Sequence, residues 1–394
     1  TGHYNYTILA SLGIFVIIVG MAIMGWATRR LIRTMIGVVM PGESGNFSDL
    51  IFSKFQLSKG PKVVVIGGGT GLSVMLRGLK SKTYNLTAVV TVADDGGSTG
   101  RIREDLDIIA PGDLRNCLVA MADKEGLMEQ LFAHRFGGSG DLTGHSFGNL
   151  FIAALIEVLG DVEEAMDATS KILRVRGKVI PSSAEKIRLN AKMTDGRIIE
   201  GESQIPHAHG RIKSVFTTPE RPKAIRSAVD AIKGADAIVL GPGSLYTSIM
   251  PNLCVPDIIE AIRDSKAPKI YICNVMTQKG ETDDYTVSDH VKAINKQAGD
   301  KIIDFVIANN GDVDPAVLQR YVAHGSHPVI IDKKEIGETG ATLILSDLIN
   351  KENSATHDTK KLANVLFDLI NALRTDLSPE LLHYYLKRYT LTHR

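Results

Sequence analysis

The chain has 394 residues, a length typical of one large or two ordinary domains, and its 44% hydrophobic and 23% charged residues are those of a globular protein. The formal net charge of +1 leaves no basic excess to neutralise a phosphate backbone, so nucleic acid is excluded as an expected partner. The three cysteines lie far apart and are odd in number, which fits neither a disulfide framework nor a zinc site and indicates a reducing compartment.

The N-terminal segment, residues 1–28, contains no Asp, Glu, Lys or Arg. Its apolar run, residues 8–26, is just long enough to cross a bilayer as a helix, and Trp26 suits the membrane interface. Arginines follow at positions 29, 30 and 33, and positive flanks stay on the cytoplasmic side. A signal peptide would carry its positive residues before the apolar run, and a buried core helix is the other alternative. We predict a transmembrane segment that anchors a cytoplasmic domain to the cell membrane.

Residues 29–60 are predicted to form a juxtamembrane connector, because the breaker cluster Pro41–Asn46 interrupts their apolar pattern. The sequence begins at Thr1 rather than Met, so we also expect the full protein to begin earlier, with room for a preceding membrane segment.

From residue 61 to residue 394, short β-branched runs alternate with helical stretches, which is typical of a parallel sheet covered by helices on both faces. The predicted strands are residues 63–66, 86–92, 237–240, 269–273, 305–308 and 329–331. Polar and apolar residues alternate over Ala184–Glu202 around a Thr-Asp-Gly-Arg turn, which predicts a hairpin outside the main sheet. The fold class is therefore α/β: a Rossmann-like three-layer sandwich with a mostly parallel sheet, a small antiparallel excursion and an N-terminal transmembrane helix.

A glycine loop follows the first predicted strand. Glycines at positions 67, 68, 69 and 71 let the backbone approach a phosphate closely, and the start of the next helix offers free N–H groups. The third glycine of a dinucleotide fingerprint would fall on Leu72, and no Walker lysine follows. The loop therefore predicts a phosphate without identifying the cofactor, and it argues against an NAD(P) oxidoreductase. A tight turn without a ligand is the alternative.

A second cluster, Asp94–Arg101, follows the strand that is predicted to end at Val92. Adjacent carboxylates can hold Mg²⁺, which neutralises a diphosphate, and Arg101 can pair with phosphate oxygens. A solvated acidic turn that caps a helix is the alternative. In Asp113-Leu-Arg115-Asn116, an acid, a base and an amide are combined in another turn before a helix, where Asp113 could instead be an N-cap.

Further polar residues fall at predicted turns. His145 precedes a strongly apolar helix and could act as a general acid or donate to a phosphate, although a histidine at a helix start is more often structural. A second glycine turn, Gly241–Ser248, suggests a ligand with two anchored ends, such as a diphosphate between a nucleoside and another group. His207 and His209 alternate as in a strand and could chelate a metal, but no third ligand is evident.

The expected chemistry is positioning combined with metal electrostatics, as phosphoryl or nucleotidyl transfer requires, since no Gly-x-Ser-x-Gly elbow indicates nucleophilic hydrolysis. The expected catalytic residues are Asp95, Arg101, Arg115 and His145, and the expected Mg²⁺ ligands are Asp94 and Asp95. The expected ligand-binding residues are Gly67, Gly68, Gly69, Thr70, Gly71, Gly96, Gly97, Ser98, Asp113, Asn116, Asn149, Gly241, Gly243, Ser244, Tyr246, Asn274 and Gln278.

Six ordered blocks together resemble the YvcK/CofD-like family, whose YvcK branch is known as gluconeogenesis factors. They are Val-Ile-Gly-Gly-Gly-Thr-Gly-Leu (65–72), Asp-Asp-Gly-Gly-Ser-Thr-Gly-Arg (94–101), Pro-Gly-Asp-Leu-Arg-Asn (111–116), His-Ser-Phe-Gly-Asn (145–149), Gly-Pro-Gly-Ser-Leu-Tyr-Thr-Ser (241–248) and Cys-Asn-Val-Met-Thr-Gln (273–278). The resemblance spans about residues 61–375 and leaves the membrane segment outside it.

The resemblance implies a CofD-like nucleotide-binding domain that binds a UDP-sugar, such as UDP-N-acetylglucosamine, and supports cell-wall precursor supply and cell shape on gluconeogenic carbon. The alternative that it implies is a Mg²⁺-dependent transferase, phospho-lactate transferase-like or nucleotidyl-transferring, that acts on a nucleoside-diphosphate substrate. Tyr321 resembles the family's sugar-nucleotide tyrosine. Thr356-His357-Asp358 stands where the family often has Arg-His-Asp, a departure that bears on the identity of the sugar nucleotide. A homodimer is expected.

Overall fold

The computed structural model describes residues 6–39, 57–123, 126–350 and 354–375. The contacts divide the chain into two compact units, Thr1–Gln56 and Leu57–Arg394. The predicted breaker cluster Pro41–Asn46 lies outside the described residues.

The first unit contains one long helix, α1 (Tyr6–Val39). Within it, Ile8–Leu31 is long and apolar enough to cross a membrane, with a mean hydropathy of 2.6. The helix continues past residue 28, where the transmembrane segment was predicted to end. The guanidinium of Arg30 lies 5.2 Å from the ring of Trp26, so a cation and an aromatic ring occur together near the end of the apolar stretch.

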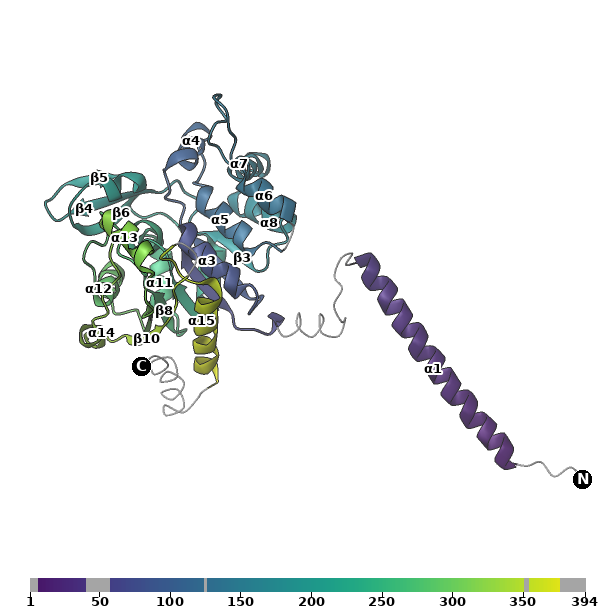
Figure 1. The fold of residues 1–394 in the computed structure, drawn as a ribbon. Coiled ribbons are helices and arrows are strands. Elements are labelled where there is room, and N and C mark those ends of the chain that lie inside the picture. Colours follow the sequence, from purple (N-terminus) through teal and green to yellow (C-terminus); the bar gives the residue numbers. More distant parts are fainter. Residues whose placement is uncertain (1–5, 40–56, 124–125, 351–353, 376–394) are drawn as a thin grey trace, which may run out of the picture. The chain divides into compact units, whose positions relative to one another are not determined.

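The second unit is an α/β domain in which helices pack around strands (Figure 1). Its main sheet has seven strands in the order β10-β9-β8-β7-β1-β2-β3. Its strands are β1 (Val63–Gly67), β2 (Leu86–Val90), β3 (Lys178–Pro181), β7 (Ala237–Leu240), β8 (Lys269–Ile272), β9 (Phe305–Asn309) and β10 (Thr342–Ser346). Every neighbouring pair is parallel. The predicted α/β class with a mostly parallel sheet is confirmed.

The strand order reverses between β1 and β7. From β1 the chain proceeds outward to β2 and β3, and from β7 it proceeds in the other direction to β8, β9 and β10. Crossovers between parallel strands are right-handed, so the helices that connect the strands of one half cover the opposite face from those that connect the strands of the other half. Loops at the carboxyl ends of the two central strands therefore open into a crevice, where ligands of such sheets bind.

The helices that follow the first half of the sheet are α3 (Gly69–Leu79), α4 (Gly97–Asp105), α5 (Gly112–Met121), α6 (Gly126–Ala133), α7 (Phe147–Leu159) and α8 (Val162–Ile172). The later helices are α9 (Arg226–Lys233), α10 (Met250–Leu253), α11 (Pro256–Asp264), α12 (Val287–Ala298), α13 (Pro315–Ala323), α14 (Lys333–Thr339) and α15 (Thr359–Arg374). Helix α3 packs against α5 and α15 in one layer, whereas α11 packs against α9 and α10 in the other.

A small antiparallel sheet, in the order β5-β4-β6, confirms the predicted hairpin. Strands β4 (Arg188–Met193) and β5 (Ile198–Glu200) are joined by the predicted turn, and β6 (Ile212–Thr218) pairs with the other edge of β4. The short helix η1 (Glu202–His207) follows β5, so the strand-like alternation that was expected for His207 and His209 is wrong.

The predicted strand at residues 329–331 is also wrong. The segment makes only isolated bridges, from Pro328 to Met276 and from Ile330 to Thr286. Pro328 has no N–H to donate to a ladder, and Ile330 is exposed. The place beside β9 belongs to β10 instead, which pairs with β9 along its whole length.

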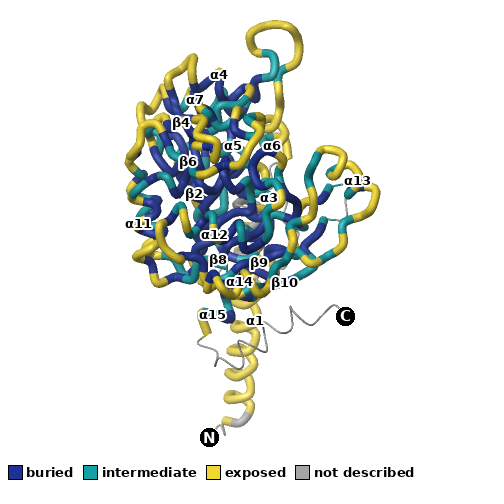
Figure 2. The backbone as a smooth tube through the Cα atoms, turned by 90° about the vertical axis from the view of Figure 1, so that its left-hand side faces the viewer, coloured by how far each residue is buried: buried dark blue, intermediate teal, exposed yellow. Residues whose placement is uncertain are grey.

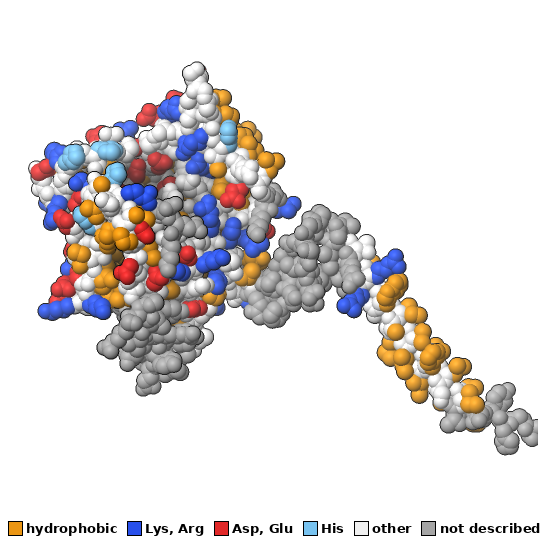
Figure 3. Space-filling model, viewed as in Figure 1, with side chains coloured by type: hydrophobic (Ala, Val, Ile, Leu, Met, Phe, Trp, Pro, Cys, Tyr) orange, Lys and Arg blue, Asp and Glu red, His pale blue; other side chains and the backbone are white. Residues whose placement is uncertain are grey.

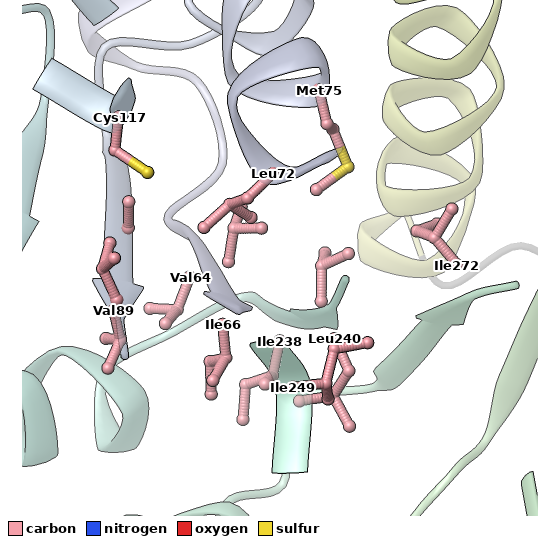
Figure 4. Close-up of a cluster of buried hydrophobic side chains, with 14 of the residues drawn as sticks. Val64, Ile66, Leu72, Met75, Val89, Cys117, Ile238, Leu240, Ile249 and Ile272 are labelled. Carbon is pink, nitrogen blue, oxygen red and sulfur yellow. The ribbon is translucent and has the colours of Figure 1, made fainter. Parts of the chain in front are cut away.

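The strands of the main sheet form the buried centre of the domain (Figure 2). Strand β1 is buried at every position, because helices cover both faces of the sheet. Val64 and Ile66 of β1, Leu72 of α3, Val89 of β2 and Ile238 of β7 belong to one continuous core (Figure 4). This core fixes the carboxyl ends of β1 and β7, and thereby the two turns that follow them.

Candidate functional site

Two glycine turns meet at the carboxyl ends of β1 and β7. A Cβ atom at Gly71 would lie 2.8 Å from the carbonyl oxygen of Pro242 and 3.0 Å from the Cα of Gly243. Gly67 lies against Gly241, and Gly69 adopts a φ of +68° beside the hydroxyl of Ser248. The glycines therefore let two backbones pack directly against each other, and they hold the start of α3 open at the crevice. Thr70, in the first turn of α3, is exposed.

The carboxylate of Asp113, in the first turn of α5, lies in front of the first glycine turn. It accepts a hydrogen bond from the N–H of Gly69, and a Cβ atom at Gly68 would collide with it. Burial, followed by the charge of Asp94, raises the pKa of Asp113 to about 7, although the Gly69 N–H and Arg115 oppose the shift. A carboxylate thus occupies a position where the sequence predicts a phosphate.

Asp94 lies beside Asp113. Its Oδ1 atom accepts a hydrogen bond of 2.9 Å from the N–H of Gly96, and its Oδ2 would be 2.9 Å from a Cβ atom at Gly112. Burial raises the pKa of Asp94, and hydrogen bonds from Gly96 and Thr99 lower it. Both carboxylates are therefore desolvated and electrostatically coupled.

Two glutamates that the sequence did not single out belong to the same electrostatic cluster. Burial, followed by the charges of Asp94, Glu281 and Asp113, raises the pKa of Glu202 to about 8. Burial raises the pKa of Glu281 to about 7, and Thr247 donates to both of its oxygens at 3.2 and 3.3 Å. Glu202 comes from η1 and Glu281 from the loop after β8, so only the tertiary fold brings them together.

Asp95, the expected partner of Asp94 as a metal ligand, has a different local role. Its oxygens accept hydrogen bonds from the backbone N–H groups of Ser203 (2.8 Å) and Glu202 (3.1 Å). These bonds satisfy N–H groups at the start of η1 and fix Glu202 at the site. Because both oxygens of Asp95 accept hydrogen bonds from η1, Asp94 and Asp113 are better candidates than Asp95 for cation binding.

Arg115 is buried at the junction of α5 and α7. It donates to Ser146 Oγ and to Asn116 Oδ1, both at 2.6 Å. Its aliphatic stem packs directly against Gly148, where a side chain would collide with it. Ser146 also caps α7 by accepting from the N–H of Asn149. Arg115, Asn116 and Asn149 therefore lie close together in the structure. Among the described residues, Asn149 Oδ1 is buried without a hydrogen-bond partner.

His145 is buried and its Nδ1 atom lies 3.1 Å from the hydroxyl of Ser98. Burial, followed by the charge of Arg101, lowers the pKa of His145, which favours the neutral ring. Arg101 donates to the carbonyl oxygen of Thr143 at 2.8 Å and holds the loop before His145. Gly97 has a φ of +47°, a left-handed conformation that glycine adopts easily, at the start of α4.

The second glycine turn is linked to the loop after β8. Gln278 donates to Ser244 Oγ at 2.7 Å and accepts from Asn274 at 3.2 Å, so these predicted residues form one network. The hydroxyl of Tyr246 lies 2.8 Å from that of Tyr285, and burial raises the pKa of Tyr246. Tyr246 therefore ties this turn to the loop before α12.

Tyr321, on α13, packs against a small apolar cluster that is separate from the main core. This cluster includes Val275 and Met276, which directly follow Asn274. His357 follows Thr356, the residue that departs from the family's Arg-His-Asp pattern. His357 is buried and hydrogen-bonded to the backbone of Cys273, and burial lowers its pKa to about 4. Both residues thus lie close in the fold to the loop that carries Asn274 and Gln278.

The chemistry of these donors fits Mg²⁺, a hard cation that prefers carboxylate oxygens. No group of three or more His, Cys, Asp or Glu side chains within the described parts of the chain is arranged to hold a metal by itself. Mg²⁺ is usually held by one or two carboxylates together with substrate phosphates and water.

Comparisons with known proteins agree with this architecture. A model of the family described as 2-phospho-L-lactate transferase CofD matches residues 63–349. The gluconeogenesis factor of Bacillus subtilis is 49% identical over 311 residues, which are 79% of this chain and 98% of the relative. A Nostoc protein is 47% identical over 357 residues, covering 90% of this chain and 78% of its own length.

A solved structure of a Bacillus halodurans protein, a member of the UPF0052 family, has a TM-score of 0.75 to this chain. It is 48% identical and covers 78% of this chain and 99% of its own. The fold and its edge loops define an α/β protein of the CofD-like class, with carboxylates gathered at the point where the strand order reverses. More particularly, the chain belongs to the CofD-like gluconeogenesis factor family.

Proposed function

We propose that the domain binds a nucleoside-diphosphate sugar, a UDP-sugar such as UDP-N-acetylglucosamine, in the crevice between the two glycine turns. The observation that carries the proposal is the group of desolvated carboxylates, Asp94, Asp113, Glu202 and Glu281, beside the open start of α3. Above the raised pKa values of these carboxyls the site is anionic, and it accepts an anionic diphosphate far better with a cation between them, because like charges at this depth repel strongly. Mg²⁺, held by Asp94 and Asp113, would supply that charge.

Neighbouring residues support the remaining contacts. Ser244, Asn274 and Gln278 form a polar network that can hold the nucleoside or the sugar by hydrogen bonds. Arg115 offers a buried guanidinium, which pairs well with phosphate oxygens. Tyr321 is proposed to contact the sugar nucleotide, because it packs beside the loop that carries Asn274.

The biological role that we propose follows the relatives. Proteins named gluconeogenesis factor match most of this chain, which supports a role of that kind. The family resemblance extends the proposal to cell-wall precursor supply and cell shape on gluconeogenic carbon. Helix α1 is proposed to hold the domain at the membrane, and the arginines at positions 29, 30 and 33 favour a cytoplasmic position for the domain.

A second candidate function is a Mg²⁺-dependent transferase that acts on a nucleoside-diphosphate substrate. The family description, 2-phospho-L-lactate transferase, favours it. In this reading Arg115 stabilises charge on the phosphates, and neutral His145 accepts or donates a proton through Ser98.

One experiment distinguishes the two functions. Residues 57–394 form a compact unit of their own, and the solved relative matches 78% of this chain over 99% of its own length, so residues 57–394 are used. Phosphorus NMR would follow UDP-N-acetylglucosamine with Mg²⁺, and then UTP with N-acetylglucosamine 1-phosphate. Binding measured by calorimetry with unchanged phosphorus signals supports the binding function. Conversion of either mixture establishes the transferase, and no binding of any of these compounds contradicts both functions.

A further inference from the structure

A second cavity lies between helix α4 and the small antiparallel sheet. It has a volume of about 380 Å³, which is within the range of cavities that bind small molecules. Its walls come from α4 and the loop before it, from the segment that leads into β4, and from β4, β5 and β6. Of its described lining residues, only Asp95 was also predicted for the crevice, so the cavity is a separate place for a ligand.

Arg103, on α4, brings a buried positive charge to this cavity. Its guanidinium donates to the carbonyl oxygens of Ile187 at 2.7 Å and Ala93 at 3.4 Å, and it forms no ion pair with a carboxylate among the residues that the structure describes. Burial lowers the pKa of Arg103, and the charge of Asp95 opposes this shift. A guanidinium has more N–H groups than two carbonyls accept, and buried charges are normally paired. Arg103 therefore has both charge and donors to offer an anion.

The acidic residues of the cavity do not serve as the partner of Arg103. Both oxygens of Asp95 accept hydrogen bonds from the start of η1. Glu200 lies 3.9 Å from Arg188, and Glu104 is exposed to solvent, which screens its charge. Arg103 is thus a buried cation without a counter-ion.

Lys186 adds an exposed cation to the same cavity. Its ammonium pairs with Asp107, but exposed ion pairs contribute little free energy, so Lys186 can exchange this partner for an anionic ligand. On the face of the domain that Figure 3 shows, basic and acidic side chains are interspersed. A broad positive field therefore does not attract anions to that face, and selectivity for an anion rests on individual side chains such as Arg103 and Lys186.

Asn190, on β4, supplies an unused hydrogen-bond acceptor. Its side chain is buried, with 3% of the residue exposed, and its Nδ2 donates to Thr218 Oγ1 at 2.9 Å. Its Oδ1 is buried and has no hydrogen-bond partner in the described parts of the chain. Such an oxygen costs free energy that a donor would restore. An ionised phosphate only accepts hydrogen bonds, whereas a hydroxyl also donates them, so a ligand with both groups satisfies Arg103 and Asn190 together.

We propose that this cavity binds a small phosphorylated polyol or sugar. The phosphate pairs with the guanidinium of Arg103 and the ammonium of Lys186, because charge-assisted hydrogen bonds to phosphate are strong. A hydroxyl of the ligand donates to Asn190 Oδ1. The inference is independent of the proposed UDP-sugar, since none of these side chains was placed in the crevice.

Isothermal titration calorimetry of glycerol 3-phosphate into the full chain in detergent, with a chelator present, tests the proposal. The wild type should bind at millimolar concentration or below, and Arg103→Met should weaken binding by about tenfold or more. Circular dichroism would verify folding, and Lys186→Glu, at an exposed position, should weaken binding about threefold or more. Arg226→Met is the matched control, because the Arg226 side chain is 93% exposed and lies outside the cavity, so the dissociation constant should not change.

Propyl phosphate tests the role of the hydroxyl. It resembles glycerol 3-phosphate but has no hydroxyl on its carbon chain, so the wild type should bind it about threefold or more weakly. Asn190→Leu should remove this difference between the two compounds.

Three results would overturn the proposal. The first is a wild type that does not bind glycerol 3-phosphate at millimolar concentration, or that binds both compounds equally. The second is binding that is unchanged in Arg103→Met and in Lys186→Glu. The third is binding that changes in Asp113→Asn but not in Arg103→Met, which would place the phosphate in the crevice instead.

Discussion

At the scale of single residues, burial and mutual repulsion raise the pKa values of several neighbouring carboxyl groups at the site. The pKa of Asp113 rises to about 7 and that of Glu202 to about 8, whereas isolated carboxyls of these types titrate near 4. A folded domain that keeps these protons is stabilised in acid and loses stability as they dissociate. Such a cost is expected where carboxylates are positioned for a cation.

Removing one carboxylate should therefore stabilise the ligand-free domain. Because the folded-state pKa of Asp113 lies above its unfolded value of 3.8, the free energy of unfolding falls as pH rises from about 4 to about 7. We expect Asp113→Asn to raise that free energy by about 1–3 kcal/mol at pH 8 and to change it little at pH 4. Urea unfolding of the domain at both pH values, with a chelator present, measures the effect.

The control is Asp195→Asn. Hydrogen bonds from the backbone and side chain of Arg197 lower the pKa of this exposed carboxyl, so its loss should not stabilise the domain at pH 8. An Asp113→Asn domain that is less stable than the wild type at pH 8 would contradict the interpretation.

Protons and Mg²⁺ should compete for the same carboxylates. Since the pKa of Asp113 is raised to about 7, Mg²⁺ should increase the thermal stability of the domain more at pH 8 than at pH 6. Thermal unfolding with Mg²⁺ or with a chelator at each pH checks this. A stabilisation by Mg²⁺ that is equal at pH 6 and pH 8 would be inconsistent with a site on these groups.

At the scale of elements, the two glycine turns are a packed unit of two backbones. Gly71→Ala places a Cβ atom 2.8 Å from the carbonyl oxygen of Pro242, which neither backbone can avoid without moving. We expect a loss of about 1–3 kcal/mol in the free energy of unfolding, and weaker ligand binding. Gly337→Ala on α14 has open space around the new atom and should be neutral or stabilising. Equal effects of the two substitutions in urea unfolding would show that the turns are not packed in this way.

At the scale of the whole molecule, the chain combines an apolar helix with a separate α/β domain. Ile8–Leu31 has the length and hydropathy of a membrane span, so the full chain should float with lipid vesicles and resist extraction by alkaline carbonate. Residues 57–394 should remain soluble in the same experiment. Extraction of the full chain by carbonate would contradict the proposed anchor.

The sequence predicts this fold well where local patterns carry the signal. The β-branched runs locate the central strands, and the glycine turns locate the edge where ligand loops gather, because both signals depend on neighbouring residues. Strand β10 was missed in favour of residues 329–331, which have similar residue types but begin after Pro328.

The site could be predicted only in part, for a similar reason. Asp94 follows strand β2, and Asp113 and Arg115 lie in the first turn of α5. All three belong to recognisable motifs, and the structure brings them together. Glu202 and Glu281 belong to no motif, and only the packing of η1 and of the loop after β8 brings them to the cluster. Asp95 was expected at the site because it is adjacent to Asp94 in the sequence. Nothing in the sequence indicated that its oxygens accept hydrogen bonds from the start of η1.

The central claim, that Asp94 and Asp113 bind a diphosphate through Mg²⁺, is tested most directly by isothermal titration calorimetry of UDP-N-acetylglucosamine into residues 57–394. Binding should require Mg²⁺, should weaken by about tenfold or more in Asp94→Asn, and should be unchanged in the control Asp195→Asn. Binding that is equally strong in a chelator, or that is unaffected by Asp94→Asn, would contradict the account.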